Sequence, residues 1–92
     1  MKLLLTRPAA AQLDRVLTYI DVLNPQGARH VLQRVQAAMD LLLQHPFAGS
    51  TTARPGVRRL LVRPYPYAIT YRVRAGEVVI LGIRHSARRS QV

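Results

Sequence analysis

Apolar residues recur every three or four positions through the first half of the chain, which is the spacing of amphipathic helices. A short apolar run at residues 3–5 predicts a brief strand. Thr6, Arg7 and Pro8 then mark the start of a helix, because proline fits the first turn, where its missing N–H costs no hydrogen bond. The pattern predicts a helix over residues 8–22. Its apolar stripe is Leu13, Val16, Leu17, Ile20 and Leu23.

A second helix is predicted over residues 25–44. Asn24 is a suitable N-cap and Pro25 a suitable first helical residue. Because the connection is so short, the two helices are expected to fold back on each other as an antiparallel hairpin. Pro46 disfavours helical geometry at His45 and so ends the helix. The apolar stripe of this helix is Ala28, Val31, Leu32, Val35, Ala38, Met39 and Leu42.

The period changes to two in the second half of the chain. Residues 46–56 are rich in Gly, Pro, Ser and Thr and predict a mobile loop. Three strands are then predicted, at residues 57–63, 67–74 and 78–83, joined by links short enough for an antiparallel meander. The continuous apolar run 78–83 indicates an interior strand covered by the helices. The predicted fold class is α+β, with order βααβββ and a helical hairpin packed on an antiparallel-meander sheet.

Length and composition narrow the possibilities further. The chain has 92 residues, so a single domain over 1–92 is expected. It contains no cysteine, which removes disulfide and thiolate chemistry and fits an intracellular protein. Residues 2–5 are too short for a signal sequence or a membrane span, so a cytoplasmic location is expected, with no membrane partner. The histidines and the four acidic residues have no metal-ligand or paired-carboxylate spacing, so no metal and no cofactor are predicted.

The charge of the chain predicts an anionic partner. Fourteen Lys and Arg residues stand against four Asp and Glu, giving a formal charge of +10. Residues 1–49 contain five basic and three acidic residues, whereas residues 50–92 contain nine arginines and one glutamate, so the half that forms the sheet carries most of the field. Thirteen of the cations are arginine, whose guanidinium binds phosphate or carboxylate in two-point geometry.

The chain contains an ordered set of short segments, which are Pro8–Asp14, Tyr19–Ile20, Asn24–Ala28, His45–Gly49, Gly56–Leu60, Tyr65–Val73 and Val79–His85. Over nearly the whole chain this set resembles the RelE/ParE superfamily of toxins from bacterial type II toxin-antitoxin systems. The resemblance implies the βααβββ fold, action in the cytoplasm and neutralisation by a cognate antitoxin with an acidic segment, giving a hetero-oligomer.

The superfamily divides by mechanism. One branch cuts mRNA at the ribosome, which requires a proton acceptor, a proton donor and cations around the phosphate. In this chain Ala68 stands where that branch commonly has Arg or another polar residue, and the tail lacks a terminal Tyr, so only His85 and Arg84 are catalytic candidates under this alternative. The tail is more similar to the ParE-like branch, which implies a non-enzymatic poison of DNA gyrase, and we favour that branch. A basic nucleic-acid-binding module without toxicity is a third hypothesis.

Basic residues around the sheet are the candidates for target binding. Period-two geometry places Arg58 on the face opposite Arg59 and Arg63, so these three cannot all serve one site. We predict that the solvent-facing side of the sheet and its C-terminal edge contact the target. The candidates are Arg58, Arg59, Arg63, Arg84, His85, Arg88 and Arg89.

Candidates for antitoxin binding come from both halves of the chain. Leu41 and Leu43 flank the core position Leu42 and form a surplus apolar strip that fits a partner helix. Arg72 and Arg74 are the cations predicted to meet antitoxin carboxylates. Tyr65, Tyr67 and Tyr71 could stack on bases, but the alternation favours inward packing of Tyr67 and Tyr71. Aromatic residues make up only 5% of the chain, which argues against a dedicated base-stacking surface. His30 and His45 are predicted to be structural.

Overall fold

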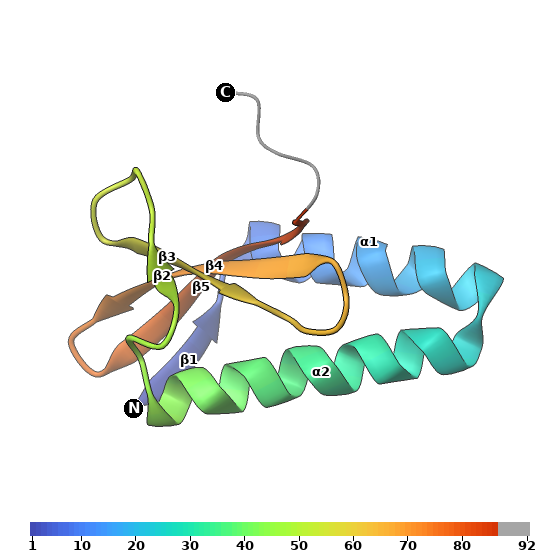
Figure 1. Cartoon of the computed structure of the whole chain (residues 1–92), viewed down its shortest axis with the longest axis horizontal. Coiled ribbons are helices and arrows are strands. Elements are labelled where there is room, and N and C mark those ends of the chain that lie inside the picture. The colour runs from blue at the N-terminus through green and yellow to red at the C-terminus, as the bar shows by residue number, and fades with distance from the viewer. Residues whose placement is uncertain (87–92) are drawn as a thin grey trace.

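The computed structural model describes residues 1–86 and has two layers, a helical hairpin and a five-stranded sheet (Figure 1). The predicted α+β fold is confirmed. The elements are β1 (Lys2–Leu5), α1 (Arg7–Leu23), α2 (Pro25–Gln44), β2 (Ser50–Thr51), β3 (Val57–Leu61), β4 (Tyr67–Arg74) and β5 (Glu77–His85).

Two capping residues define the hairpin. The Thr6 hydroxyl accepts a hydrogen bond from Ala9 N at 3.3 Å and donates one to Ile80 O at 2.8 Å, so it starts α1 and ties that start to β5. Helix α1 begins at Arg7, one residue earlier than predicted. Asn24 ends α1 with its N–H and caps α2 with its side chain, as predicted. Because a single residue serves both helices, they must run antiparallel, as Figure 1 shows.

The strands follow the order β1-β5-β4-β3-β2. Strands β3, β4 and β5 form the predicted antiparallel meander, and β5 is interior as expected. Strand β1 pairs with β5 in parallel at one edge, so the complete sheet is mixed. The loop prediction for residues 46–56 was wrong at Ser50–Thr51, which pair with β3, and β3 ends at Leu61, two residues earlier than predicted. A two-residue strand has no periodicity for a sequence pattern to detect.

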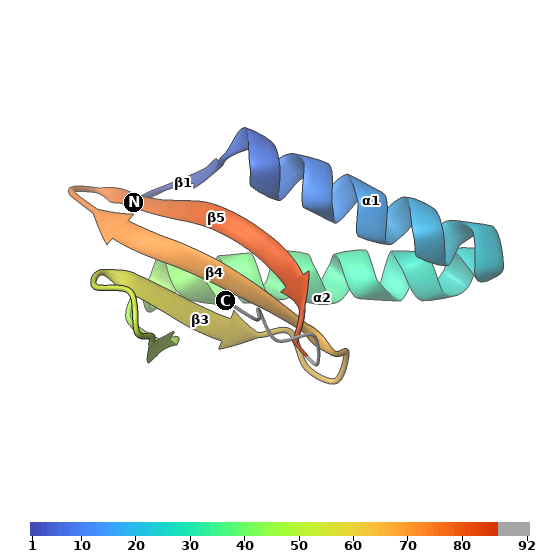
Figure 2. The ribbon, with the colours of Figure 1, turned by 90° about the horizontal axis from the view of Figure 1, so that it is seen from above.

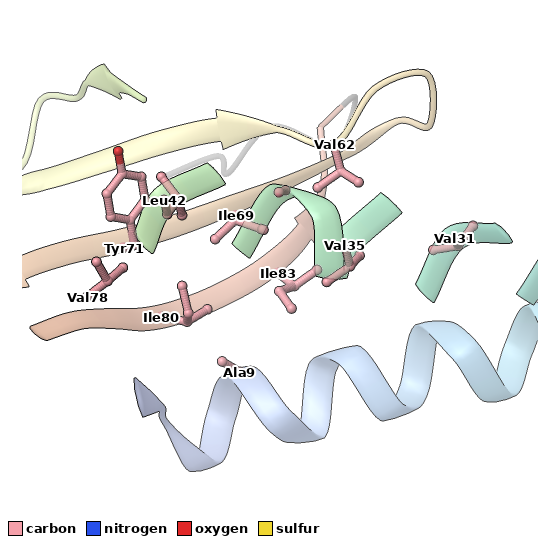
Figure 3. Packing of buried hydrophobic residues seen from close by; sticks show 11 residues of the cluster. Ala9, Val31, Val35, Leu42, Val62, Ile69, Tyr71, Val78, Ile80 and Ile83 are labelled. Atoms are coloured by element: carbon pink, nitrogen blue, oxygen red, sulfur yellow. The ribbon is translucent and has the colours of Figure 1, made fainter. Parts of the chain in front are cut away.

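One continuous apolar core fills the space between the layers (Figure 3). Tyr71 is fully buried and Tyr67 packs against the core, so the predicted inward packing of both rings is confirmed. Leu23 was wrongly assigned to the apolar stripe, since its side chain is 69% exposed. The last turn of α1 projects past the end of the sheet, as Figure 2 shows, so it has no sheet to pack on. The largest fully buried side chains are Tyr71, Leu42, Ile69, Ile80, Val35, Val62 and Val78.

A bulge in β5 resets the alternation of its side chains. Thr70 pairs with Gly82 but the next residue, Tyr71, pairs with Ile80, so Leu81 is an extra residue. Ile80 and Ile83 therefore both lie in the core despite their odd spacing. The edge of β5 beyond β1 is closed by α1, because the Gln12 side chain accepts a hydrogen bond from Ile83 N at 2.9 Å.

Candidate anion-binding face

We call the side of the sheet that faces away from the helices the outer face. On β4 the outer face carries the residues that alternate with the buried Ile69 and Tyr71. The residues that pair with them on β3 and β5 continue this face across the sheet. In Figure 2 it is the side of the sheet turned toward the viewer, with α2 crossing behind. The cations on this face are Lys2, Arg59, Arg72, Arg74 and Arg84.

Charge along the outer face is not uniform. At one end, Glu77 pairs across the sheet with Lys2 on one side and Arg74 on the other, so the single glutamate of the chain lies between two cations. Toward the other end, Arg59 and Arg84 are exposed and flank Thr70. The second region has the greater capacity to attract an anion, because no carboxylate lies in its rows among residues 1–86.

Arg58 lies on the helix side of the sheet, opposite in register to the buried Tyr71. Its Nη1 donates hydrogen bonds to Gly49 O at 2.8 Å and to Phe47 O at 3.4 Å, and its guanidinium lies 5.0 Å from the centre of the Phe47 ring. The structure thus separates Arg58 from Arg59, as the alternation predicted, and engages Arg58 in holding the segment before β2.

His85 also lies on the helix side. It pairs with Tyr67, two residues beyond the buried Ile83, and the two rings meet edge to face with centroids 5.6 Å apart. Arg84 points to the outer face, so the two residues required by the nuclease alternative lie on opposite faces of β5.

A shallow groove of about 190 Å³ runs between α2 and the free edge of β3. We call it the α2/β3 groove. Its floor is apolar and an arginine borders it from each element, Arg34 from α2 and Arg63 from the segment after β3. Leu41 lines the groove, whereas Leu43 is half-buried and does not. The lining residues are Arg34, Ala37, Ala38, Leu41, Leu60, Leu61, Val62 and Arg63.

The candidate residues therefore fall into separate places. Arg72 and Arg74 lie on the outer face with Arg59 and Arg84, and not in the groove with Leu41. Arg88 and Arg89, both target-binding candidates, lie outside the described residues. Arg34 and Thr70 could not be recognised from the sequence as site residues. A helix pattern does not reveal which exposed side chains face a strand edge, and a lone threonine in a strand carries no signal.

Two further properties concern chemistry that the described residues could support. Within residues 1–86 no three His, Cys, Asp or Glu side chains come together in a way that could hold a metal ion. None of the helices in that range is long and apolar enough to span a membrane.

The fold and these two surfaces define a small basic protein with a cationic sheet face and a shallow groove beside it. Residues 3–90 match the model of the ParE toxin of type II toxin-antitoxin systems, parDE, and the chain belongs to this family.

Similar proteins agree with this assignment. The chain is 32% identical to the putative toxin Y4kP of Sinorhizobium fredii over 88% of this chain and 83% of the relative. It is 39% identical to the toxin RelE2 of Caulobacter vibrioides over 87% and 89% of the two chains. A solved structure, the chromosomal ParDE TA system from P. aeruginosa, superposes with a TM-score of 0.81 at 33% identity, covering 92% of this chain and 95% of that one.

Proposed function

We propose that this chain inhibits DNA gyrase by binding, and that a cognate antitoxin neutralises it by occupying the α2/β3 groove. The observation that carries the first part is the outer face, where exposed guanidinium groups of Arg59 and Arg84 flank Thr70 with no carboxylate in the same rows. Such a face binds phosphate without any chemical step.

Trapping of cleaved DNA needs only differential affinity. A ligand that binds the cleaved gyrase–DNA complex more tightly than the intact one shifts the population toward the cleaved state by the ratio of the two affinities. Exposed arginines on a sheet surface suit this task, because a broken or distorted backbone presents phosphates at positions that intact duplex does not. The toxin then stabilises the cleaved state of its target by binding it more tightly than the intact state.

The arrangement around β5 supports binding over catalysis. General acid–base cleavage of RNA requires a proton-transfer group and a cation within reach of the same phosphate. His85 packs on Tyr67 under the sheet while Arg84 lies on the outer face, and Ala68 on that face offers no functional group. The nuclease alternative therefore lacks a converging set among the described residues.

The α2/β3 groove suits an acidic, amphipathic segment. Its apolar floor accepts side chains such as Leu or Val, and Arg34 and Arg63 on its two borders attract carboxylates. The edge of β3 is also open beside the groove. Because Val62 N donates to Tyr67 O, the alternation of an antiparallel ladder directs the backbone N–H and C=O of Leu61 away from β4. Strand β2 does not cover these groups, since it pairs only with Arg58 and Arg59. The similarity to the ParDE TA system from P. aeruginosa supports a cognate antitoxin as the partner of this chain.

Controlled expression in bacteria tests the gyrase target. Induction of the chain is expected to produce filamentous cells with cleaved chromosomal DNA and intact transcripts, and purified chain is expected to increase the DNA cleavage caused by gyrase in vitro. Arg59→Gln is expected to reduce both effects at least about tenfold, since a charged hydrogen bond contributes on the order of 1.5 to 3 kcal/mol. Arg29→Gln, which removes the same charge from the exposed surface of α2, is the matched control.

Two outcomes would refute the gyrase target. Rapid translational arrest with new mRNA ends at codon positions would indicate the ribosome-dependent endonuclease instead. No growth defect at all, together with salt-sensitive binding to any polyanion, would indicate a basic binding module without toxicity.

A further inference from the structure

One row of the outer face brings three strands together at a glycine. Arg59 on β3 pairs with Thr70 on β4, and Thr70 pairs with Gly82 on β5. Side chains that pair directly across a sheet lie about 5 Å apart on the same face. Gly82 follows the bulge at Leu81, and the bulge is what places it beside Thr70 rather than under the helices.

The missing side chain at Gly82 leaves room for Arg84. A Cβ built on Gly82 would lie 3.9 Å from Arg84 Nε and 3.3 Å from Thr70 Oγ1. Arg84 is two residues further along the same strand, so its side chain runs back over Gly82 toward the threonine. Gln12 Oε1 would be 2.9 Å from that Cβ and already accepts the Ile83 N–H, so it closes the row at the sheet edge.

Arg59 and Arg84 thus border one threonine from opposite sides. The Thr70 hydroxyl donates only a long hydrogen bond, 3.4 Å, to Gly82 O, so it can turn to a ligand at little cost. The next row on this face consists of Leu61, Ala68 and Arg84, so Arg84 is its charged member. Glu77 is five residues from Gly82 along β5, roughly 16 Å in an extended strand, and it already faces two cations.

We propose that Arg59, Thr70 and Arg84 form a clamp for a single phosphodiester group of a nucleic-acid backbone. Donors from three adjacent strands lie around one position of the outer face, which suits the tetrahedral oxygens of a phosphate better than the two oxygens of a planar carboxylate. The clamp proposal rests on the proposed function in one respect, namely that the phosphate belongs to a DNA strand held by gyrase. It goes beyond that function because it places the phosphate subsite on two adjacent rows of the outer face, the row of Arg59, Thr70 and Gly82 and the row of Arg84. Gly82 is the residue that leaves room for Arg84 beside Thr70.

Direct binding to the purified full-length chain tests the clamp. The probe is a fluorescein-labelled 12-nucleotide single-stranded DNA, followed by fluorescence anisotropy at several salt concentrations. An oligonucleotide of the same sequence with an uncharged methylphosphonate backbone, and a hexaglutamate peptide, are the competing probes. Arg59→Gln and Arg84→Gln are compared with Arg29→Gln, which makes the same charge change away from the sheet.

The clamp predicts that Arg59→Gln and Arg84→Gln each weaken DNA binding about tenfold and each lower the salt dependence by about one released ion. Arg29→Gln is expected to weaken binding by less than about threefold, as a diffuse charge does. Gly82→Ala keeps every charge but fills the space beside Thr70 and Arg84, so it is also expected to weaken binding. Circular dichroism of each variant establishes that it folds.

Three results would overturn the clamp. Equal losses for all three arginine substitutions would show that only the diffuse field binds DNA. Equal affinity for the methylphosphonate strand would show that phosphate charge is not recognised, and tighter binding of hexaglutamate with the same arginine dependence would assign the row to carboxylates. A chain that shows the predicted Arg59 and Arg84 dependence yet leaves gyrase cleavage unchanged would support the clamp and refute the gyrase target, so the two failures are distinguishable.

Discussion

Arg58 and Arg59 are adjacent in the chain and carry the same side chain, yet the sheet gives them opposite surroundings. Arg58 turns toward the helices, where the carbonyls of Phe47 and Gly49 accept its hydrogen bonds and the Phe47 ring lies beneath its charge. Arg59 turns to the outer face, where it is exposed beside Thr70. One of the two cations holds a loop and the other is available to a ligand.

The same contrast separates the two faces of the whole sheet. The face under the helices has buried Val, Ile and Tyr side chains in a continuous core, while the outer face has five cations among residues 1–86. The net charge of +10 therefore says less about binding than the alternation of side chains along each strand, which assigns the charged residues to one face of the sheet or the other. Substitutions at neighbouring positions on opposite faces can test this reading directly.

The largest difference is expected between Ile80 and Val79 in β5. Ile80 is fully buried against the helices, so Ile80→Ala should lower the free energy of unfolding by about 3 to 4 kcal/mol, within the usual range for such a cavity. Val79 lies half-exposed on the outer face, so Val79→Ala should cost less than about 1 kcal/mol. Urea denaturation of both variants measures the difference. Similar losses at the two positions would mean that the outer face is covered and not available to a ligand.

A smaller loss is expected from removing one buried hydroxyl. Tyr71 Oη accepts a hydrogen bond from Gly49 N at 2.8 Å, and both groups are buried. Tyr71→Phe should cost about 2 kcal/mol, because the Gly49 N–H is left without a partner. Tyr19→Phe is the control, since that ring is 68% exposed and its loss should be within about 0.5 kcal/mol. Thermal unfolding gives both values, and a neutral Tyr71→Phe would show that Gly49 has another partner.

The next contrast is between the two arginines themselves. Arg58→Met keeps the aliphatic chain but loses the contacts to Gly49 and Phe47, so it should cost about 1 to 2 kcal/mol, discounted for partial exposure. Arg59→Met should change stability by less than about 0.5 kcal/mol and yet abolish most growth inhibition. Denaturation and an induction assay at equal expression measure the two effects. The division of roles would be wrong if Arg58→Met, still folded, lost as much toxicity as Arg59→Met.

Local patterns were sufficient for both helices and for the three strands of the meander. Both helices follow from capping residues and apolar stripes, and the Asn24-Pro25 step predicted the hairpin correctly because it both ends one helix and begins the next. The period of two predicted the meander and the separation of Arg58 from Arg59. The stripe failed at Leu23, since no sequence pattern tells where the sheet beneath a helix ends.

Features that depend on partners far away in the chain could not be predicted. Strand β2 exists because Ser50 and Thr51 meet β3, and the parallel position of β1 depends on β5, more than 70 residues away. The bulge at Leu81 breaks the parity by which a sequence assigns faces, so neither the shared face of Arg59, Thr70 and Arg84 nor the burial of both Ile80 and Ile83 follows from spacing alone. The sequence therefore predicted a set of cations and the solvent-facing side of the sheet, but not which of those cations lie side by side.

The smallest stability effect, and the sharpest test of the groove, is expected at Leu41 on α2. Its neighbour Leu42 is fully buried, whereas Leu41 is 40% exposed and lines the α2/β3 groove, so Leu41→Ser should cost only about 0.5 to 1 kcal/mol. If an antitoxin segment fills the groove, the same change should weaken antitoxin binding about tenfold, because an apolar contact at the centre of an interface contributes on the order of 1 to 2 kcal/mol. Toxicity without antitoxin should not change, since Leu41 is not on the outer face. Val22→Ser, at the exposed tip of α1, removes a comparable apolar side chain away from the groove and should leave both quantities unchanged. Calorimetric titration of the variants with the antitoxin separates these effects, and an undiminished affinity of Leu41→Ser would place the antitoxin elsewhere on the molecule.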